Sequence, residues 1–378
     1  MRTEIYLVIA IVATICIVLR RRVRPIREFG TIDAIVPAFN EERCIVDSVE
    51  RLLQNPYLNQ IFVVNDGSTD ATPALIDLLA VQHSRLTVIH QENTGKGAAL
   101  MAGITRSEAE FVFLTDADTT LPSTGDGLGY MLAEMNNGAD AVGGIPLSDL
   151  RGAGLLPHIR ASTKLIVISL HRTFQQLLGG APFLISGACG LFRREMLVRV
   201  PFNDRTKVED LDLTWSLIAN GYKIRQCNRS FVYSQECNTL KAELNRWRRW
   251  IAGYAVCMRL HRQLLRTRFG LLTVIPVALS PFIAVGFLTH ALEPVVLHND
   301  WVHLPLYLFP FQWMVAVYVI GAVGAIHHRR ASLIFLAPAA LVYVLICYFV
   351  WLSHGLRGLF TGKEPQREKP ERYAHVVA

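Results

Sequence analysis

The segment TDADT places Asp116 and Asp118 two positions apart, directly after the apolar run FVFL. In an extended segment these two side chains point the same way, and converging carboxylates repel each other unless a cation lies between them. Hard oxygen ligands favour Mg²⁺ or Mn²⁺, and the phosphates of a nucleotide would complete the coordination. The segment therefore predicts a divalent-metal site at Asp118 and Asp116, although two acids at this spacing are also common without a function.

Two further polar segments suit the nucleotide itself. In NDGSTD, Asp66 can accept hydrogen bonds from a base or a ribose, and Gly67 allows a close turn. The alternative is an ordinary turn that leads into a helix cap. In GKG, Lys96 lies between two glycines and can reach a nucleotide or a phosphate. The GxxxxGK(S/T) spacing of a P-loop is missing, which argues against ATP hydrolysis.

The segment VEDLDLTW combines acids with the start of an amphipathic helix. Glu209 and Asp210 come before Leu213 and Leu217, which have the spacing of one helix face. An acid held at the entrance of a helix can act as a general base toward an acceptor hydroxyl, so Asp210 and Glu209 are candidate catalytic residues. The alternative is a helix N-terminus that is stabilised by negative charge.

Arginines and tryptophans are concentrated in NRWRRWIAGY, about twenty residues ahead of a long apolar run. The planar fork of arginine suits phosphate oxygens, so Arg246 and Arg249 can neutralise a leaving diphosphate, with Trp250 as the floor of the acceptor site. The alternative is a positive-inside anchor with an aromatic belt. Gly187, in SGACGLFRRE, lies among small residues that let a substrate, or simply another part of the backbone, approach closely.

Alternating strands and helices place these segments. The patterns predict strands in TIDAIVPAFN, QIFVVND, LTVIHQ and FVFL, and helices in EERCIVDSVERLLQN, DATPALIDLLAVQ and AALMAGITRS. Asp70 can cap the second helix, with Pro73 in its first turn. The alternation implies an α/β fold with a parallel, doubly wound sheet and helices on both faces. In such sheets ligands bind at the carboxyl ends of the strands, where the candidate site residues fall: Asn40, Glu41, Asp66, Lys96, Asp116 and Asp118.

Four apolar runs contribute to a composition that is 51% hydrophobic over 378 residues, which is high for a soluble protein. They occupy residues 5–19, 271–292, 304–326 and 332–352. Arginines follow the first run, so we expect an uncleaved anchor with a cytoplasmic C-terminal side rather than a signal peptide. Prolines in the later runs predict kinked or broken helices. Both flanks of the last run are basic, so either that run is re-entrant or one basic flank faces outward.

Five parts follow from these features. They are an N-terminal membrane anchor (1–24), a cytoplasmic domain (25–240), amphipathic interface helices with RWRRW (241–270), membrane segments (271–352) and a basic tail (353–378). The net charge of +7 suits anionic lipid headgroups and a diphosphate. The chain has no recognisable nucleic-acid module, so nucleic acid is not an expected partner. None of the seven cysteines forms a CxxC pair, which argues against a metal cluster or a disulfide framework.

Taken in order, the segments resemble those of the membrane-integrated family 2 glycosyltransferases, which include cellulose, hyaluronan, chitin-oligosaccharide and poly-N-acetylglucosamine synthases. PAFNEE, with Pro37, Asn40 and Glu41, is similar to the first nucleotide loop of the family, and VVNDGSTD is similar to the second. TDADT resembles the DxD metal motif, VEDLDLTW the TED segment, RWRRW the (Q/R)xxRW motif, and SGACG with FRR the acceptor loop. The resemblance covers about residues 31–255 and implies a Rossmann-like domain of the GT-A type.

The resemblance also implies an inverting, metal-dependent transfer from a UDP-sugar, with Asp210 as the general base. UDP would be held by Mg²⁺ or Mn²⁺ at Asp118 and by arginines. The expected product is a growing exopolysaccharide, with N-acetylglucosamine as the best match for the sugar. It would be made at the cytoplasmic face of the plasma membrane, with an accessory export protein as a further partner.

Two departures from the family pattern favour a second hypothesis. Arg246 replaces the glutamine that is usual in processive synthases, and arginine at this position also occurs in ceramide glucosyltransferases. The chain also has few spans with which to build a secretion channel. The alternative is therefore the transfer of one sugar to a membrane lipid. A non-catalytic nucleotide-binding scaffold is disfavoured because all four key acids are present: Asp66, Asp116, Asp118 and Asp210.

Overall fold

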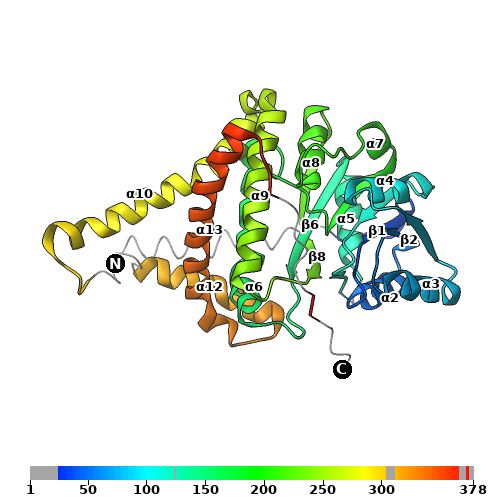
Figure 1. Ribbon diagram of the computed structural model, residues 1–378, viewed down its shortest axis with the longest axis horizontal. Coiled ribbons are helices and arrows are strands. Elements are labelled where there is room, and N and C mark those ends of the chain that lie inside the picture. The colour runs from blue at the N-terminus through cyan, green and yellow to red at the C-terminus, as the bar shows by residue number, and fades with distance from the viewer. Residues whose placement is uncertain (1–23, 123–124, 304–310, 366–371, 374–378) are drawn as a thin grey trace.

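The computed structural model describes residues 24–122, 125–303, 311–365 and 372–373. At its centre lies an eight-stranded sheet in the order β3-β2-β1-β4-β7-β6-β8-β5 (Figure 1). The strands are β1 (Ile32–Ala38), β2 (Leu58–Asp66), β3 (Leu86–Gln91), β4 (Phe111–Leu114), β5 (Thr119–Thr120), β6 (Ala141–Ser148), β7 (Gly190–Arg193) and β8 (Ile224–Ser234). The four strands predicted from the sequence are β1 to β4, and they form one half of this sheet.

The helices surround the sheet and continue into a separate helical layer. They are α2 (Ile45–Leu53), α3 (Thr72–Gln82), α4 (Lys96–Arg106), α5 (Gly127–Asn136), α6 (Leu155–Gly179), α7 (Arg194–Arg199), α8 (Glu209–Ala219), α9 (Leu240–Leu260), α10 (Ile275–His298), α12 (Phe311–His328) and α13 (Leu333–Thr361). The helices α2 to α4 confirm the three predicted helices. Pro73 lies in the first turn of α3, and the Asp70 carboxylate accepts a hydrogen bond from the Thr72 amide (2.9 Å). The N-cap position is Ala71, which has no capping side chain, so the prediction that Asp70 is the cap is wrong by one residue; Asp70 instead closes a turn just ahead of the helix.

The prediction of a parallel sheet holds for β1 to β4 and for the pair β6 and β8, but it is wrong for β7 and β5. As expected, β1 is parallel to β2 and β4, and β2 is parallel to β3. However, β7 runs antiparallel to both of its neighbours, β4 and β6, and β5 runs antiparallel to β8. The reason lies in the connection before β7, because α6 packs against α12 and α13 as well as β6. The chain therefore does not cross back over the sheet, and β7 starts from the carboxyl edge.

Two apolar cores cover the two faces of the sheet, because successive side chains of a strand point to opposite sides. Along β4, Phe111 and Phe113 join the core that includes α2, α3 and α5, whereas Val112 and Leu114 join the core that includes α4, α7 and α8. All four side chains are at most 1% exposed, as the uninterrupted apolar run predicts for a strand covered on both faces. The second core extends to α13, which contributes Trp351.

Two helices of the described chain are long and apolar enough to cross a membrane, residues 270–298 and α13. The remaining late run was also predicted to span, but its described apolar helix, Met314–His328, is shorter. Residues 304–310 and nearly all of the predicted N-terminal anchor lie outside the described residues. Pro281 and Pro338 lie inside continuous helices, so they do not break them. Figure 1 shows α10 projecting away from the sheet, while α13 packs along α9.

Candidate active site

The loops after β1 and β2 are joined to each other at the carboxyl edge of the sheet. Asn40 has a left-handed backbone conformation (φ 54°), which asparagine adopts more readily than most residues. The Asn40 side-chain oxygen accepts a hydrogen bond from the backbone amide of Thr69 (2.7 Å), and the Asn40 backbone amide donates to the Ser68 hydroxyl (2.9 Å). The two predicted nucleotide loops therefore form one continuous surface, with Pro37 near the end of β1.

Asp66, the last residue of β2, organises the next loop. Its buried carboxylate accepts hydrogen bonds from the amides of Thr94 (2.9 Å) and Gly95 (3.0 Å) through different oxygens. Gly67 has a φ of +72°, and a Cβ at this position would lie 2.7 Å from the facing backbone, so only glycine fits the turn. Asp66 consequently fixes the loop that presents Lys96.

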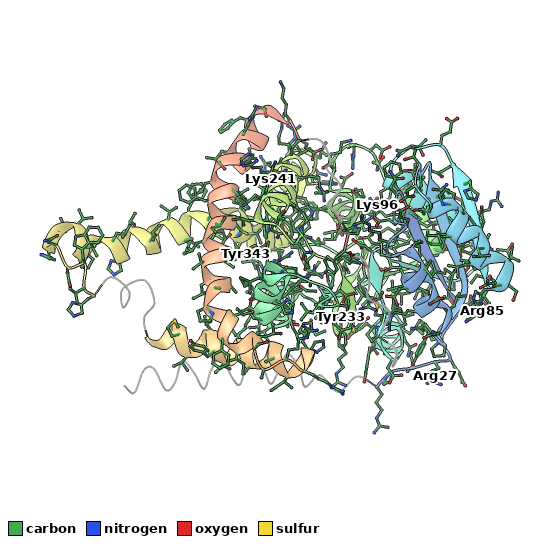
Figure 2. All side chains as sticks on the ribbon, turned by 60° about the horizontal axis from the view of Figure 1, so that its bottom comes forward. Arg27, Arg85, Lys96, Tyr233, Lys241 and Tyr343 are labelled. Atoms are coloured by element: carbon green, nitrogen blue, oxygen red, sulfur yellow. The ribbon has the colours of Figure 1, made fainter. Side chains whose placement is uncertain are left out.

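Lys96, the first residue of α4, lies where acids from two other segments meet. Its ammonium nitrogen is 2.5 Å from Asp116 and 3.4 Å from Glu209. Gly187 lies against this lysine, because a Cβ at that position would be 3.0 Å from Lys96 Nζ and 3.6 Å from the Cβ of Asp210. A small residue at 187 therefore leaves room beside the lysine. Figure 2 shows Lys96 in the middle of the molecule, between the sheet and the helical layer.

Asp116 and Asp118 do not share the predicted extended segment. The Thr119 amide donates to the Asp116 carbonyl (3.0 Å), which closes a turn and separates the partners of the two carboxylates. Asp116 faces the lysine described above, whereas Asp118 lies 2.6 Å from Arg372 of the C-terminal tail. Burial raises the pKa of Asp118 to about 6; Arg372 opposes this shift, and the carboxylates of Asp116 and Glu41 add to it.

A divalent cation fits Asp116 and Asp118 only together with phosphate oxygens. The two carboxylates offer the hard oxygen ligands that Mg²⁺ and Mn²⁺ prefer, and they are close enough for Asp116 to raise the pKa of Asp118. In residues 24–122, 125–303, 311–365 and 372–373, however, no group of three or more His, Cys, Asp and Glu side chains is arranged to hold a metal ion. The remaining ligands would have to come from a bound diphosphate and water.

Asp210, in the first turn of α8, is held by backbone amides. The Gly187 amide donates to one carboxylate oxygen (3.2 Å) and the Leu211 amide donates to the other (2.9 Å). Burial raises the pKa of Asp210, and the neighbouring Glu209 raises it further, whereas Lys96 acts in the opposite direction. A carboxylate with a raised pKa is a stronger proton acceptor, so this geometry suits a general base.

The RWRRW residues lie on α9 and have different partners. Arg246 contacts the buried carboxylates of Glu236 (2.7 Å) and Glu243, and its guanidinium lies 5.0 Å from the centroid of the Trp250 ring. Arg249 instead donates to a backbone carbonyl just upstream of α8 (2.8 Å). The two arginines therefore have different surroundings. Arg246 is ion-paired with buried carboxylates, whereas Arg249 lies at the start of the helix that carries Asp210.

A buried group of charges, here called the Glu236–Glu243 network, lies beside this part of α9. Its members are Arg160 and Lys164 from α6, Glu236, Glu243 and Arg246, and Tyr343 from α13. Arg160 contacts both carboxylates, and Lys164 lies 2.5 Å from Glu236. Although burial alone would raise the pKa of Glu236, Arg160 and Lys164 lower it. Figure 2 shows Tyr343 at the border between α13 and the rest of the molecule.

Comparisons with known proteins identify the family of this chain. Residues 33–200 match the model of the family described as Glycosyl transferase family 2. The protein is 51% identical to the "Uncharacterized glycosyltransferase YaiP" of Escherichia coli (strain K12), over 100% of this chain and 95% of that protein. The chain belongs to glycosyltransferase family 2.

This glycosyltransferase is similar to two further proteins. It is 29% identical to the poly-β-1,6-N-acetyl-D-glucosamine synthase of Staphylococcus aureus (strain COL) over 60% of this chain and 55% of the synthase, so the match spans about half of that protein. A mannosyltransferase from Pyrobaculum calidifontis, PcManGT, solved in complex with GDP-Man and Mn²⁺, has a TM-score of 0.60 and 17% identity. That match covers 95% of this chain and 99% of the mannosyltransferase, and it shows a shared GT-A-like fold.

The Glu236–Glu243 network and Arg372 of this glycosyltransferase were not predicted from the sequence. One signal was present for the network, because Arg160 and Lys164 interrupt the apolar face of a helical pattern. Charged residues at such positions need a buried partner of opposite charge. No comparable signal marks Arg372, which is one of several basic residues in the tail.

Proposed function

We propose that this glycosyltransferase transfers N-acetylglucosamine from a UDP-sugar to a growing exopolysaccharide, with inversion at the anomeric carbon. The geometry of the Asp210 carboxylate carries the proposal. This group is buried, accepts hydrogen bonds from two backbone amides, and has a pKa that burial raises. It lies near Lys96, whose ammonium faces Asp116 of the DxD segment. The choice of sugar rests on the similarity to the staphylococcal synthase.

The donor nucleotide binds along the carboxyl edge of the sheet in this proposal. The donor-binding residues are Pro37, Asn40, Glu41, Asp66, Lys96 and Asp116. Asn40 joins the first two loops and Asp66 fixes the third, so these loops form a prearranged surface for a base, a ribose and a diphosphate. Asp118 and Asp116 hold Mg²⁺ or Mn²⁺ together with the diphosphate. When bound, the divalent cation neutralises charge that develops on the leaving UDP.

Asp210 acts on the acceptor. Its carboxylate takes the proton of an acceptor hydroxyl, and the hydroxyl oxygen attacks the anomeric carbon on the face opposite to UDP. The new glycosidic bond forms as the bond to UDP breaks, so the configuration inverts in a single displacement. Glu209 helps to keep the pKa of Asp210 raised, and Gly187 supports the carboxylate through its amide while leaving space for the substrate.

The acceptor approaches along α9. The Trp250 ring offers a face for a sugar, and Arg249 lies beside the start of α8. Because α9 packs along the apolar helix α13, we place this acceptor site next to the cytoplasmic face of the plasma membrane. Membrane lipids are then direct neighbours of the enzyme, and an accessory export protein would carry the polymer onward.

Transfer of a single sugar to a membrane lipid is the second candidate. Arg246 at the first position of the (Q/R)xxRW motif favours it. In the described residues only two helices meet the length and hydropathy expected for a membrane span. The two candidates differ in the size of the product.

The test uses the purified, detergent-solubilised protein with Mn²⁺ or Mg²⁺ and a panel of UDP-sugars and GDP-mannose. Release of the nucleoside diphosphate identifies the donor, and sizing of the product identifies the acceptor class. We expect UDP release with UDP-N-acetylglucosamine and a long, glycosidase-sensitive chain. A single sugar on a lipid would replace the first candidate by the second, and release of GDP alone would overturn the choice of donor.

A further inference from the structure

The C-terminal tail reaches the donor site at Arg372. Its guanidinium lies 2.6 Å from Asp118 Oδ2 and donates to both oxygens of Glu41 at 3.2 Å each. The side chains are 15% (Arg372), 9% (Glu41) and 11% (Asp118) exposed. The guanidinium therefore occupies the space between two largely buried carboxylates, which come from the segments that follow β1 and β4.

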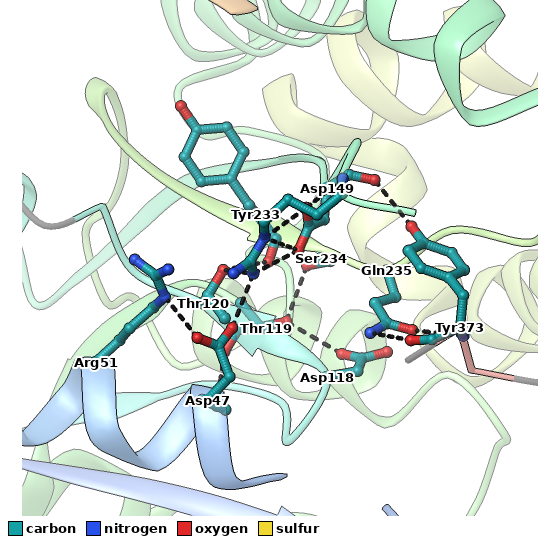
Figure 3. Close-up of polar contacts among 12 residues, drawn as sticks. Asp47, Arg51, Asp118, Thr119, Thr120, Asp149, Tyr233, Ser234, Gln235 and Tyr373 are labelled. Atoms are coloured by element: carbon teal, nitrogen blue, oxygen red, sulfur yellow. Dashed lines mark hydrogen bonds and ion pairs between the residues drawn. The ribbon is translucent and has the colours of Figure 1, made fainter. Parts of the chain in front are cut away.

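Tyr373 fastens the tail to the segment that follows β8 (Figure 3). The Tyr373 amide donates to Gln235 Oε1 (3.1 Å), and Gln235 Nε2 donates back to the Tyr373 carbonyl (3.0 Å). The Tyr373 hydroxyl donates to the Asp149 carbonyl (2.8 Å) and accepts from the Glu236 amide (3.2 Å). The Arg372 backbone carbonyl accepts a hydrogen bond from the Arg43 side chain (2.9 Å). Together with the Arg372 contact to Asp118, these contacts to four segments describe a binding site for the Arg372–Tyr373 dipeptide.

A divalent cation and Arg372 compete for the same oxygen. Metal coordination by Asp118 Oδ2 would bring two positive groups to one carboxylate oxygen, where like charges at short distance repel strongly. We propose that Asp118 has two alternative cationic partners, the Arg372 guanidinium of the tail, which also pairs with Glu41, and the divalent cation that Asp116 and Asp118 hold with the donor nucleotide. The tail is then a built-in competitor of donor binding. This inference rests on the donor site proposed above.

The docked tail also touches the acceptor side of the enzyme. The Gln235 amide donates to the Asp118 carbonyl (3.2 Å). Glu236, the next residue, forms ion pairs with Lys164 and Arg246 in the Glu236–Glu243 network. The Arg372–Tyr373 dipeptide thus contacts both the DxD turn and the Glu236–Glu243 network. Undocking of Arg372 and Tyr373 would free the donor site and remove a contact from the acceptor side in the same step.

The experiment measures Mn²⁺ binding to the full-length protein in the presence of UDP, by electron paramagnetic resonance of free Mn²⁺. If the tail is docked about nine-tenths of the time, it weakens the apparent affinity about tenfold. We therefore expect Arg372→Ala to bind Mn²⁺ about tenfold more tightly than the wild type, and Tyr373→Phe to shift the affinity in the same direction by less. Lys363→Ala is the matched control, because it removes an exposed cation from the same end of the chain.

A second readout needs no variant. Hydrogen exchange of the peptide that contains Tyr373 should become faster when Mn²⁺ and UDP are added to the wild type, because its amide loses the bond to Gln235. Unchanged or weaker Mn²⁺ binding by Arg372→Ala, with binding still lost in Asp118→Asn, would overturn the competition alone. Mn²⁺ binding that is the same in the wild type and Asp118→Asn would overturn the proposed donor site and the competition together.

Discussion

The proposed donor half of the site is joined by hydrogen bonds between short polar side chains and backbone amides, whereas the Glu236–Glu243 network, beside the proposed acceptor half, is joined by buried opposite charges. In the donor half, Asn40 and Asp66 hold loops that follow neighbouring parallel strands. In the network, Arg160 and Arg246 reach Glu236 from two different helices. The first arrangement orders loops through neutral backbone groups, while the second depends on several charges that are buried together.

The difference predicts separate consequences for mutations. Neutralising a donor-side or catalytic acid should change binding or turnover and cost the fold less, about 1 to 3 kcal/mol, because weakened hydrogen bonds to amides are the main loss. Neutralising a member of the Glu236–Glu243 network should destabilise the fold, because breaking a buried ion pair leaves an uncompensated charge.

Asp210→Asn carries the largest expected effect. Loss of the general base should lower kcat by about 10² to 10⁴-fold and leave UDP binding unchanged. Asp212→Asn is the matched control on the same helix, because Asp212 contacts Arg205 (2.9 Å) and His261 (2.7 Å) instead of the site. This control should lower the thermal midpoint and leave the kcat of the folded enzyme largely intact. Normal turnover in Asp210→Asn would contradict the assignment of the base.

Glu236→Ala tests the Glu236–Glu243 network. It leaves Arg160, Lys164 and Arg246 with one carboxylate fewer, and we expect a loss of about 3 to 5 kcal/mol in the free energy of unfolding, seen as a lower unfolding midpoint. Glu195→Ala, which breaks an exposed pair with Arg199, should leave the midpoint unchanged. An unchanged midpoint in Glu236→Ala together with lost transfer would instead assign these charges to acceptor binding.

Trp250→Ala should separate acceptor use from donor binding. The variant removes the ring under Arg246, a cation–π contact worth about 0.5 to 2 kcal/mol, and the proposed floor for the acceptor sugar. We expect transfer to fall about tenfold, as about 1.4 kcal/mol implies, while the affinity for UDP stays the same. Trp301→Ala, at an exposed tryptophan, is the control. An equal loss of transfer and of UDP binding would favour a purely structural role for this helix.

The pH dependence of kcat gives the smallest expected change. Asp210 must be ionised to accept a proton, so kcat should fall as the pH drops through its pKa, which burial and Glu209 hold above the ordinary value for aspartate. Lys96 lowers this pKa, so Lys96→Met should move the acid limb to higher pH at saturating donor. Lys223→Met, at an exposed lysine, should leave the limb in place. A limb that moves to lower pH in Lys96→Met would contradict the placement of this lysine beside the base.

Local patterns predicted much of the donor half. The continuous apolar run of β4 predicts a strand that is buried on both faces, and Phe111 and Val112 do fill opposite cores. Parallel strands bring their carboxyl ends to one edge, and the structure places Asn40, Asp66 and Lys96 there. The predicted extended geometry of the DxD segment was wrong, because a hydrogen bond between backbone groups closes a turn at Asp116.

By itself, the amino-acid sequence determined the strands β1 to β4, the helices between them and the polar residues at their ends, because each follows from the spacing of neighbouring residues. The tertiary structure alone decided the direction of β7, the partners of Arg246 and the docking of the tail. Arg160 contacts a carboxylate 76 residues away, and Arg372 contacts one 331 residues away. A buried charge requires an opposite charge nearby in space, but nothing in its sequence neighbourhood says which distant segment supplies that charge.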